Sequence, residues 1–218
     1  MIVGIFSEFV ETIVHNILKY RKLYPDNIFE QRSKYGISVW QSRHPDVNKY
    51  IRKVLENSKQ LLERGLIDSY IFTTYDNKGN VLDQIVISLK IKNQLTSSSS
   101  NTTSASASTT MNLTTDQLYY LEEEFRSFIL QLGLQDNILM KLNDECTWGL
   151  MVETIEDAST DILQSTLTSG DWLIDNNMLP SSRNNNNNDN DKPFMIRPIK
   201  SFQSNHMNIS LTAILKHQ

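Results

Sequence analysis

The sequence has one cysteine, five prolines and seven glycines among 218 residues, and no excess of positive charge. One cysteine cannot form an internal disulfide, so a disulfide-stabilised scaffold is excluded. The scattered glycines form no GxGxxG or GxxxxGK[ST] loop, which argues against nucleotide binding through a glycine-rich loop. A net charge of −4 and a pI near 5.6 argue against holding nucleic acid through the overall charge of the chain.

Long apolar runs are also absent. No stretch approaches the ~20 apolar residues that a membrane span needs. The first residues are apolar enough to resemble a signal peptide, but they lack a basic start, and Glu8, Glu11 and His15 interrupt them. We therefore expect neither a signal peptide nor a membrane segment.

Hydrophobic residues make up 39% of the chain, slightly few for a globular protein, and the deficit is local. Residues 96–110 contain 12 Ser or Thr in 15 positions, and residues 181–191 contain no hydrophobic residue. Such tracts bury too little apolar surface to offset the entropy of ordering them. The composition predicts one compact domain over residues 1–218, with disordered inserts at 96–110 and 181–191.

Three helices are predicted from apolar residues at i, i+3 and i+4 spacing. The first covers residues 5–18. The second opens at Pro45, a residue suited to a first helical turn, and Gly65 is placed to cap its end. The third begins at Thr114, which forms a capping-box pattern with Gln117.

Alternating or β-rich runs predict the strands, and the stretch between Pro25 and Ile37 is predicted to be irregular. The expected strands are Ile37–Trp40, Leu66–Tyr75, Val81–Lys92, Thr147–Ile155, Phe194–Ile199 and Met207–Leu215. Residues 76–80 join two of them as a hairpin. This order is not a regular βαβ alternation, so we expect an α+β fold whose mostly antiparallel sheet carries helices on one face.

Few residues suggest catalysis. The histidines, His15, His44, His206 and His217, have no partners at metal-ligand spacing, so no metal or cofactor is predicted. We interpret His15 as structural and His44 as part of a turn. Cys146 has no CxxC partner and no nearby histidine, although a hydrolase using Cys146 or His44 is the enzymatic alternative. Direct DNA binding through a basic face is a further alternative, but the pI near 5.6 and the absence of a basic cluster favour recruitment through protein partners. The chemistry favours a non-enzymatic binding protein.

An edge strand near the C-terminus is the natural site for an extended peptide, because main-chain hydrogen bonds supply affinity there and side-chain pockets supply specificity. Three aromatic residues are candidates to line such pockets: Tyr50, Trp148 and Trp172. Core packing is the competing interpretation for each of them.

Several motifs carry a resemblance to a known family. The run from Tyr20 to Ile51 contains a helix ending in YP, the pattern IF-x-x-R-x-KY and the helix start HP-x-x-N-x-YI. Further motifs are Phe125–Leu139, GDWLID at 170–175 and RPIK at 197–200. Together they resemble the HORMA-domain accessory subunit of translesion DNA polymerase zeta, over almost the whole chain outside the two inserts.

The resemblance implies a HORMA fold, in which a central, mostly antiparallel sheet is backed by three helices and a mobile C-terminal safety belt traps a partner peptide. It implies that Tyr24, Tyr50 and Trp172 bind a proline-containing peptide of the polymerase catalytic subunit. An extended, proline-rich ligand loses little entropy when it docks against flat aromatic faces.

Two further surfaces follow from the resemblance. Arg126, Asp136 and Asn137 match a self-association surface that would give a HORMA homodimer, although Asn137 replaces a smaller residue. Ile196, Ser210 and Thr212 match the surface that binds the scaffold translesion polymerase. At Ser210 and Thr212 the family has a longer amide and an aromatic side chain, so this chain departs from the family pattern at both positions.

The implied function is that of an adaptor in translesion synthesis and DNA-damage tolerance. The implied location is the nucleus, with the cytoplasm as a second location, and the protein would contact DNA only indirectly and no membrane. An AAA+ remodelling ATPase is a further implied partner. The alternative within the family is a spindle-checkpoint HORMA protein that sequesters a mitotic activator.

Overall fold

A computed structural model of the chain describes residues 2–91, 114–137, 142, 145–155, 194–204 and 207–216. The predicted inserts at 96–110 and 181–191 lie outside these described residues, and so does Trp172. Within them, no helix is long and apolar enough to cross a membrane.

The helices and strands agree closely with the sequence predictions. The helices are α1 (Ile2–Tyr20), α2 (Pro45–Glu63) and α3 (Thr115–Gly133), with short 3₁₀ helices η1 (Asp26–Ile28) and η2 (Leu134–Asn137). The strands are β1 (Phe29–Lys34), β2 (Ile37–Ser42), β3 (Ile67–Tyr75), β4 (Val81–Ile91), β5 (Thr147–Thr154), β6 (Phe194–Gln203) and β7 (Met207–Lys216).

Local sequence signals fix the helix ends. His44 is the N-cap of α2, where its Nδ1 accepts a hydrogen bond from the Asp46 N–H, and this confirms its role in a turn. Gly65 follows α2 with a φ of 69°, a left-handed conformation that glycine adopts without strain. The predicted capping box of Thr114 and Gln117 starts α3.

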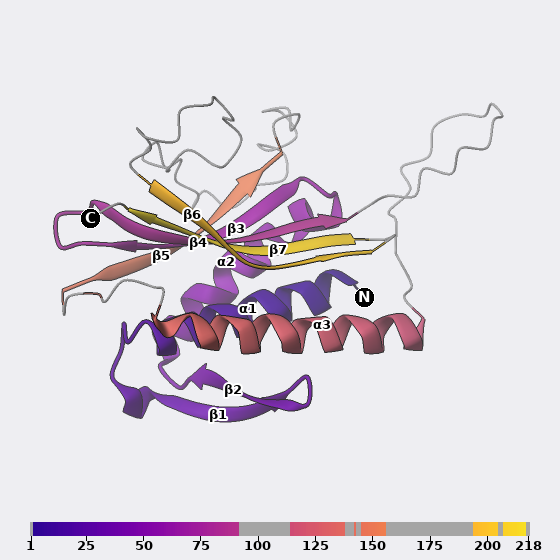
Figure 1. Cartoon of the computed structure of the whole chain (residues 1–218), viewed down its shortest axis with the longest axis horizontal. Coiled ribbons are helices and arrows are strands. Elements are labelled where there is room, and N and C mark those ends of the chain that lie inside the picture. Colours follow the sequence, from indigo (N-terminus) through magenta and orange to yellow (C-terminus); the bar gives the residue numbers. More distant parts are fainter. Residues whose placement is uncertain are drawn as a thin grey trace.

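The main sheet has five strands in the order β5-β3-β4-β7-β6, and every neighbouring pair is antiparallel. The α+β prediction is therefore confirmed. The C-terminal hairpin β6–β7 joins the sheet through β4, so β5 and β6 are its two edges (Figure 1).

The helices lie between the five-stranded sheet and the separate β1–β2 hairpin (Figure 1). Helix α1 is the centre of the core and contacts α2, α3 and β2. Its apolar stripe is fully buried, with no exposed area at Phe6, Phe9, Val10, Ile13, Val14, Ile17 and Leu18. Burial of each such side chain stabilises the fold by roughly 1.5–3 kcal/mol.

One sequence prediction about the strands is wrong. The stretch before Ile37, predicted to be irregular, contains the strand β1, which pairs with β2 from Phe29↔Ser42 to Lys34↔Ile37. The two strands are joined by Tyr35 and Gly36, which both have positive φ (51° and 69°), as a two-residue type I′ hairpin turn requires. Because the middle of β1 is exposed, its sequence lacks the apolar alternation that reveals a half-buried strand.

A buried ion pair links the end of α1 to the sheet. The Arg21 guanidinium donates a hydrogen bond to the Asp83 carboxylate on β4, and the Thr74 hydroxyl on β3 donates a second one. Asp83 has no exposed surface. Burial raises the pKa of the Asp83 carboxyl, while Arg21 and Thr74 act against this rise.

The C-terminal hairpin is also held against α3. The Lys200 ammonium on β6 lies 3.1 Å from the Glu124 carboxylate and 5.5 Å from the centre of the Phe128 ring, and both partners belong to α3. One lysine therefore makes an ion pair and a cation–π contact with the same helix.

Candidate functional site

Aromatic residues from three distant parts of the sequence meet at the β5 edge of the sheet. Tyr24 follows α1, Tyr50 lies on α2 and Trp148 lies on β5. The rings of Tyr50 and Trp148 are 5.2 Å apart in an edge-to-face arrangement, and the Trp148 indole N–H donates to the Tyr24 hydroxyl at 3.0 Å. The structure thus brings together two predicted site residues, Tyr24 and Tyr50, around Trp148.

Trp148 is held firmly in this cluster. Its ring stacks on Phe72 of β3 at 5.3 Å with an angle of 12° between the planes. Together with the bond to Tyr24, this contact fixes both the tilt and the rotation of the indole. Trp148 is therefore a partly buried residue that packs against the core and contacts both Tyr24 and Tyr50.

Tyr50 contacts the main chain of β5. Its hydroxyl accepts a hydrogen bond from the Leu150 N–H at 3.0 Å and lies 3.5 Å from the Leu150 carbonyl oxygen, to which it donates. An incoming strand uses such N–H and C=O groups when it extends a sheet. Tyr50 is 40% exposed, and its hydroxyl contacts both of these main-chain groups.

The two edges of the sheet differ in how well they could accept another strand. Edge strand β6 contains Pro198, which has no N–H to donate, and its register with β7 shifts between Pro198 and Lys200. Proline and a bulge are common protections of an edge strand. Strand β5 has no proline and keeps one register with β3 from Ser69↔Glu153 to Tyr75↔Thr147, so β5 is the better acceptor.

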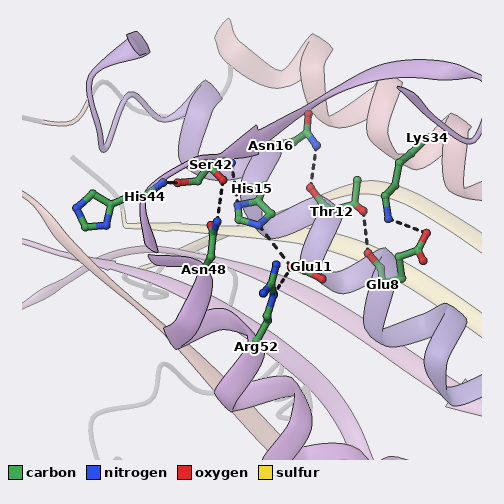
Figure 2. A network of polar contacts seen from close by, with 10 residues as sticks. All are labelled: Glu8, Glu11, Thr12, His15, Asn16, Lys34, Ser42, His44, Asn48 and Arg52. Atoms are coloured by element: carbon green, nitrogen blue, oxygen red, sulfur yellow. Dashed lines mark hydrogen bonds and ion pairs between the residues drawn. The ribbon is translucent and has the colours of Figure 1, made fainter. Parts of the chain in front are cut away.

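A buried polar network fixes α2 relative to α1 and β2 (Figure 2). The His15 Nδ1 on α1 accepts from the Ser42 N–H at 3.4 Å, and the Asn48 side-chain amide on α2 donates to the Ser42 carbonyl at 2.9 Å. His15 is only 2% exposed, which agrees with its structural interpretation. Because Asn48 lies two residues before Tyr50, this network also positions the aromatic cluster.

Glu11 extends the network to solvent. Its carboxylate lies 3.8 Å from the His15 Nε2 and 3.6 Å from the Arg52 Nε on α2 (Figure 2). The pKa of the Glu11 carboxyl is lowered, chiefly by its interaction with His15 and then by the positive charges of Arg52 and Lys34, against an opposing effect of burial.

The residues of the expected self-association surface lie at the C-terminal half of α3 and just beyond it. Arg126 is half-buried and pairs with Glu123 one turn earlier. Asp136 and Asn137 fall in η2, and their side chains lie outside the described residues. The same helix exposes Tyr119, which is 61% exposed, and Leu130, which is 53% exposed.

The residues of the expected scaffold-polymerase surface share one face of the C-terminal hairpin. Residues 209, 211, 213 and 215 of β7 are buried in the core, so Ser210 and Thr212 point to the opposite face of the sheet. Ile196 of β6 lies opposite Ile214 and therefore points the same way, with 44% of its surface exposed.

One feature of the site contradicts the sequence analysis, which found no basic cluster. Arg43, Lys49, Arg52 and Lys53 line a groove of about 600 Å³ along the first half of α2. The signal was present in the i, i+3, i+4 spacing of Lys49, Arg52 and Lys53, which places them on one face of a helix. This cluster of basic residues was overlooked because the net charge of the whole chain is negative.

A metal centre has no support in the part of the chain that the structure describes, where no three His, Cys, Asp or Glu side chains gather. Cys146 is a half-exposed free thiol just before β5. A strand edge with hydrogen-bonding main-chain groups beside aromatic side chains is suited to binding an extended chain.

Comparison with known proteins agrees with this geometry. Residues 3–162 match the HORMA domain family. The chain belongs to the HORMA-domain family. Its relatives include the chicken (Gallus gallus) mitotic spindle assembly checkpoint protein MAD2B, which is 30% identical over 159 residues, covering 73% of this chain and 68% of MAD2B. The DNA polymerase zeta processivity subunit of Schizosaccharomyces pombe is 29% identical over 158 residues, covering 71% and 69%.

Solved HORMA structures share the fold. A chain in the crystal structure of a mitotic checkpoint complex superimposes with a TM-score of 0.71 at 18% identity, and the match covers 100% of both chains. Caenorhabditis elegans HTP-2, solved bound to a HIM-3 closure motif, gives a TM-score of 0.62 at 10% identity, covering 98% of this chain and 89% of HTP-2. These similarities confirm the predicted HORMA fold.

Proposed function

We propose that this HORMA protein is a non-enzymatic adaptor and the accessory subunit of a DNA polymerase zeta. It binds a proline-containing segment of the catalytic subunit along the edge of β5, beneath the C-terminal safety belt, and it acts in translesion synthesis and DNA-damage tolerance. The observation that carries the proposal is the β5 edge, where Tyr24, Tyr50 and Trp148 converge and a tyrosine hydroxyl covers the Leu150 main chain.

The chemistry of this edge supports an extended peptide as the ligand. A strand added to β5 would form main-chain hydrogen bonds of the kind that Tyr50 now forms, and these provide affinity without depending on sequence. The exposed Tyr50 ring offers a flat face for a proline. Trp172, which lies outside the described residues, is proposed to close the site from the opposite side.

The relatives support the polymerase as the source of the peptide. Proteins named as a DNA polymerase zeta processivity subunit in Schizosaccharomyces pombe and as a DNA polymerase zeta subunit 2 in Drosophila melanogaster align over about seven-tenths of this chain. The HTP-2 structures carry bound closure motifs, so peptide capture occurs in HORMA proteins that share this fold.

The test measures the binding of proline-containing peptides from the catalytic subunit by isothermal titration calorimetry. We expect Trp172→Ala to weaken binding by at least tenfold, because an aromatic anchor at an interface contributes about 2 kcal/mol or more. Trp40→Ala is the matched control, since Trp40 lies on β2 in the separate hairpin. If Trp172→Ala binds as tightly as the wild type, the assigned site is wrong.

A spindle-checkpoint role is the second candidate, because several relatives carry the name mitotic spindle assembly checkpoint protein. Both functions use the same fold, so only the partner separates them. Purification of the tagged protein followed by mass spectrometry decides: recovery of polymerase subunits supports the first proposal, and recovery of a mitotic-activator complex supports the second.

We propose further partners for two other surfaces. The exposed residues of α3 around Arg126 support a homodimer, which the solution mass of Arg126→Ala against wild type would test. The face with Ile196, Ser210 and Thr212 is proposed for the scaffold polymerase, and binding by Ile196→Glu tests it. We also propose remodelling by an AAA+ ATPase and a nuclear location, which an ATP-dependent peptide-release assay and imaging would check.

A further inference from the structure

The groove at the start of α2 concentrates positive charge on an acidic protein. We name it the basic groove, and it is lined by Arg43, Pro45, Asn48, Lys49, Arg52, Lys53 and Glu56. Four cationic side chains and one carboxylate line it, and all five are exposed, whereas the whole chain has a net charge of −4. Local charge of this kind attracts an anionic ligand and orients it on approach.

Two of the cationic side chains are positioned by neighbouring elements. The Arg52 Nε lies 3.6 Å from the Glu11 carboxylate of α1 (Figure 2), and Arg43 donates to the main-chain carbonyl of Asn27 in η1. Like charges at i, i+3 and i+4, as at Lys49, Arg52 and Lys53, destabilise a helix. These three cationic side chains therefore do not stabilise α2, but together they would stabilise a bound anion.

The basic groove and the candidate peptide site share helix α2. Lys49 precedes Tyr50 on α2, and Lys53 lies about one turn further along the helix, while the Tyr50 hydroxyl reaches the Leu150 main chain on β5. The helix rises ~1.5 Å per residue, so the groove runs roughly 17 Å from Pro45 to Glu56. That is the length of about five residues of extended chain.

We propose that the basic groove binds an acidic segment of the same polypeptide that pairs with β5, so that the ligand leaves the edge past Tyr50 and places its carboxylates on Lys49, Arg52 and Lys53. This inference rests on the proposed function, because the acidic segment would be an extension of the peptide that pairs with β5. A peptide fits better than nucleic acid for two reasons: none of the seven lining residues is aromatic, so bases find no stacking surface, and Glu56 repels a continuous line of phosphates.

The first experiment examines the groove alone, by fluorescence anisotropy with a labelled poly-glutamate peptide of about six residues. We expect salt-sensitive binding that Lys49→Glu weakens by about fivefold, because it replaces an attraction with a repulsion. Lys59→Glu is the matched control, because Lys59 is also exposed on α2 but does not line the groove, and we expect it to change binding by less than twofold.

The same assay contains the results that overturn the proposal. Equal losses in the Lys49 and Lys59 variants would show general electrostatic attraction, and no binding to the wild type would show that the groove is not a site. An oligothymidine of equal length that binds more tightly than poly-glutamate, with the same dependence on Lys49, would make the groove a nucleic-acid site instead.

The second experiment links the groove to the edge. Proline-containing peptides from the catalytic subunit are compared with a glutamate or a glutamine extension, and only the wild type, not Lys49→Glu, is expected to prefer the glutamate form. If the glutamate and glutamine forms bind the wild type equally, the groove does not contact the extension of the trapped peptide. If neither form binds while poly-glutamate does, the proposed function fails and the groove remains an acidic-peptide site.

Discussion

Removing one oxygen atom at Tyr50 separates two roles of that residue. In the free protein its hydroxyl accepts the Leu150 N–H at 3.0 Å, a hydrogen bond with a net value of about 0.5–1.5 kcal/mol. Tyr50→Phe should therefore lower the free energy of unfolding by about 1 kcal/mol. A strand that pairs with Leu150 must first displace this hydroxyl, so the same substitution should tighten peptide binding, by up to about fivefold.

Tyr50→Ala is the informative companion variant. It removes the hydroxyl and also the ring, which packs edge-to-face on Trp148 at 5.2 Å. Such a contact contributes about 0.5–1.5 kcal/mol beyond the area it buries, and the ring is the proposed surface for a proline. We therefore expect Tyr50→Ala to weaken peptide binding, opposite in sign to Tyr50→Phe.

Two measurements check this reasoning. Calorimetric titration with a proline-containing peptide gives the affinities, and amide hydrogen exchange at Leu150 reports whether its N–H is protected. We expect faster exchange in free Tyr50→Phe than in free wild type, and equal protection in the two complexes. The reasoning is refuted if Tyr50→Phe binds several-fold more weakly than wild type while Leu150 protection is unchanged.

Two predictions concern other parts of the fold. Arg21→Leu should lower the free energy of unfolding by about 3–5 kcal/mol, because it leaves the buried Asp83 carboxylate without its cationic partner. The double variant Arg21→Leu with Asp83→Leu should recover most of this lost stability. Because burial raises the pKa of Asp83, the single variant should lose less at about pH 5, where the carboxyl binds a proton more readily, than at about pH 8; urea denaturation at both values checks the sign. Deleting residues 184–191 should leave peptide binding unchanged, because the chain from 156 to 193 joins the two edges of a sheet only about 19 Å wide. The roughly 30 residues left could span about 100 Å, so lost binding in the peptide titration would show that the tract does more than connect.

The fold was predictable to the extent that its signals are local. The three helices followed from apolar spacing, from Pro45 at the start of α2, and from the caps at Gly65 and Thr114, all readable within a few residues. Strand β1 escaped because its exposed side chains do not alternate, although the Tyr35–Gly36 turn now explains why a hairpin forms there.

The site was less predictable, because its contacts join residues far apart in the chain. The hydrogen bond between Trp148 and Tyr24 spans 124 positions, and the bond between Tyr50 and the Leu150 main chain spans 100. The resemblance to a family supplied Tyr24 and Tyr50 by motif, but no pattern in the sequence shows that a tyrosine hydroxyl covers a particular amide of β5. The basic groove was missed because net charge averages over surfaces that the fold keeps apart.

The buried pair of Arg21 and Asp83 has a consequence for the accuracy of strand alignment. Thr74 lies opposite both Asp83 on β4 and Trp148 on β5, and Asp83 lies opposite Leu215 on β7. These residues form one row across four strands. A slip of β4 by a single residue would turn the carboxylate to the other face and leave the Arg21 cation buried alone. The pair therefore helps to specify the register of the sheet. Through the row it also specifies the position of Trp148 on β5 and of the C-terminal hairpin relative to β3 and β4.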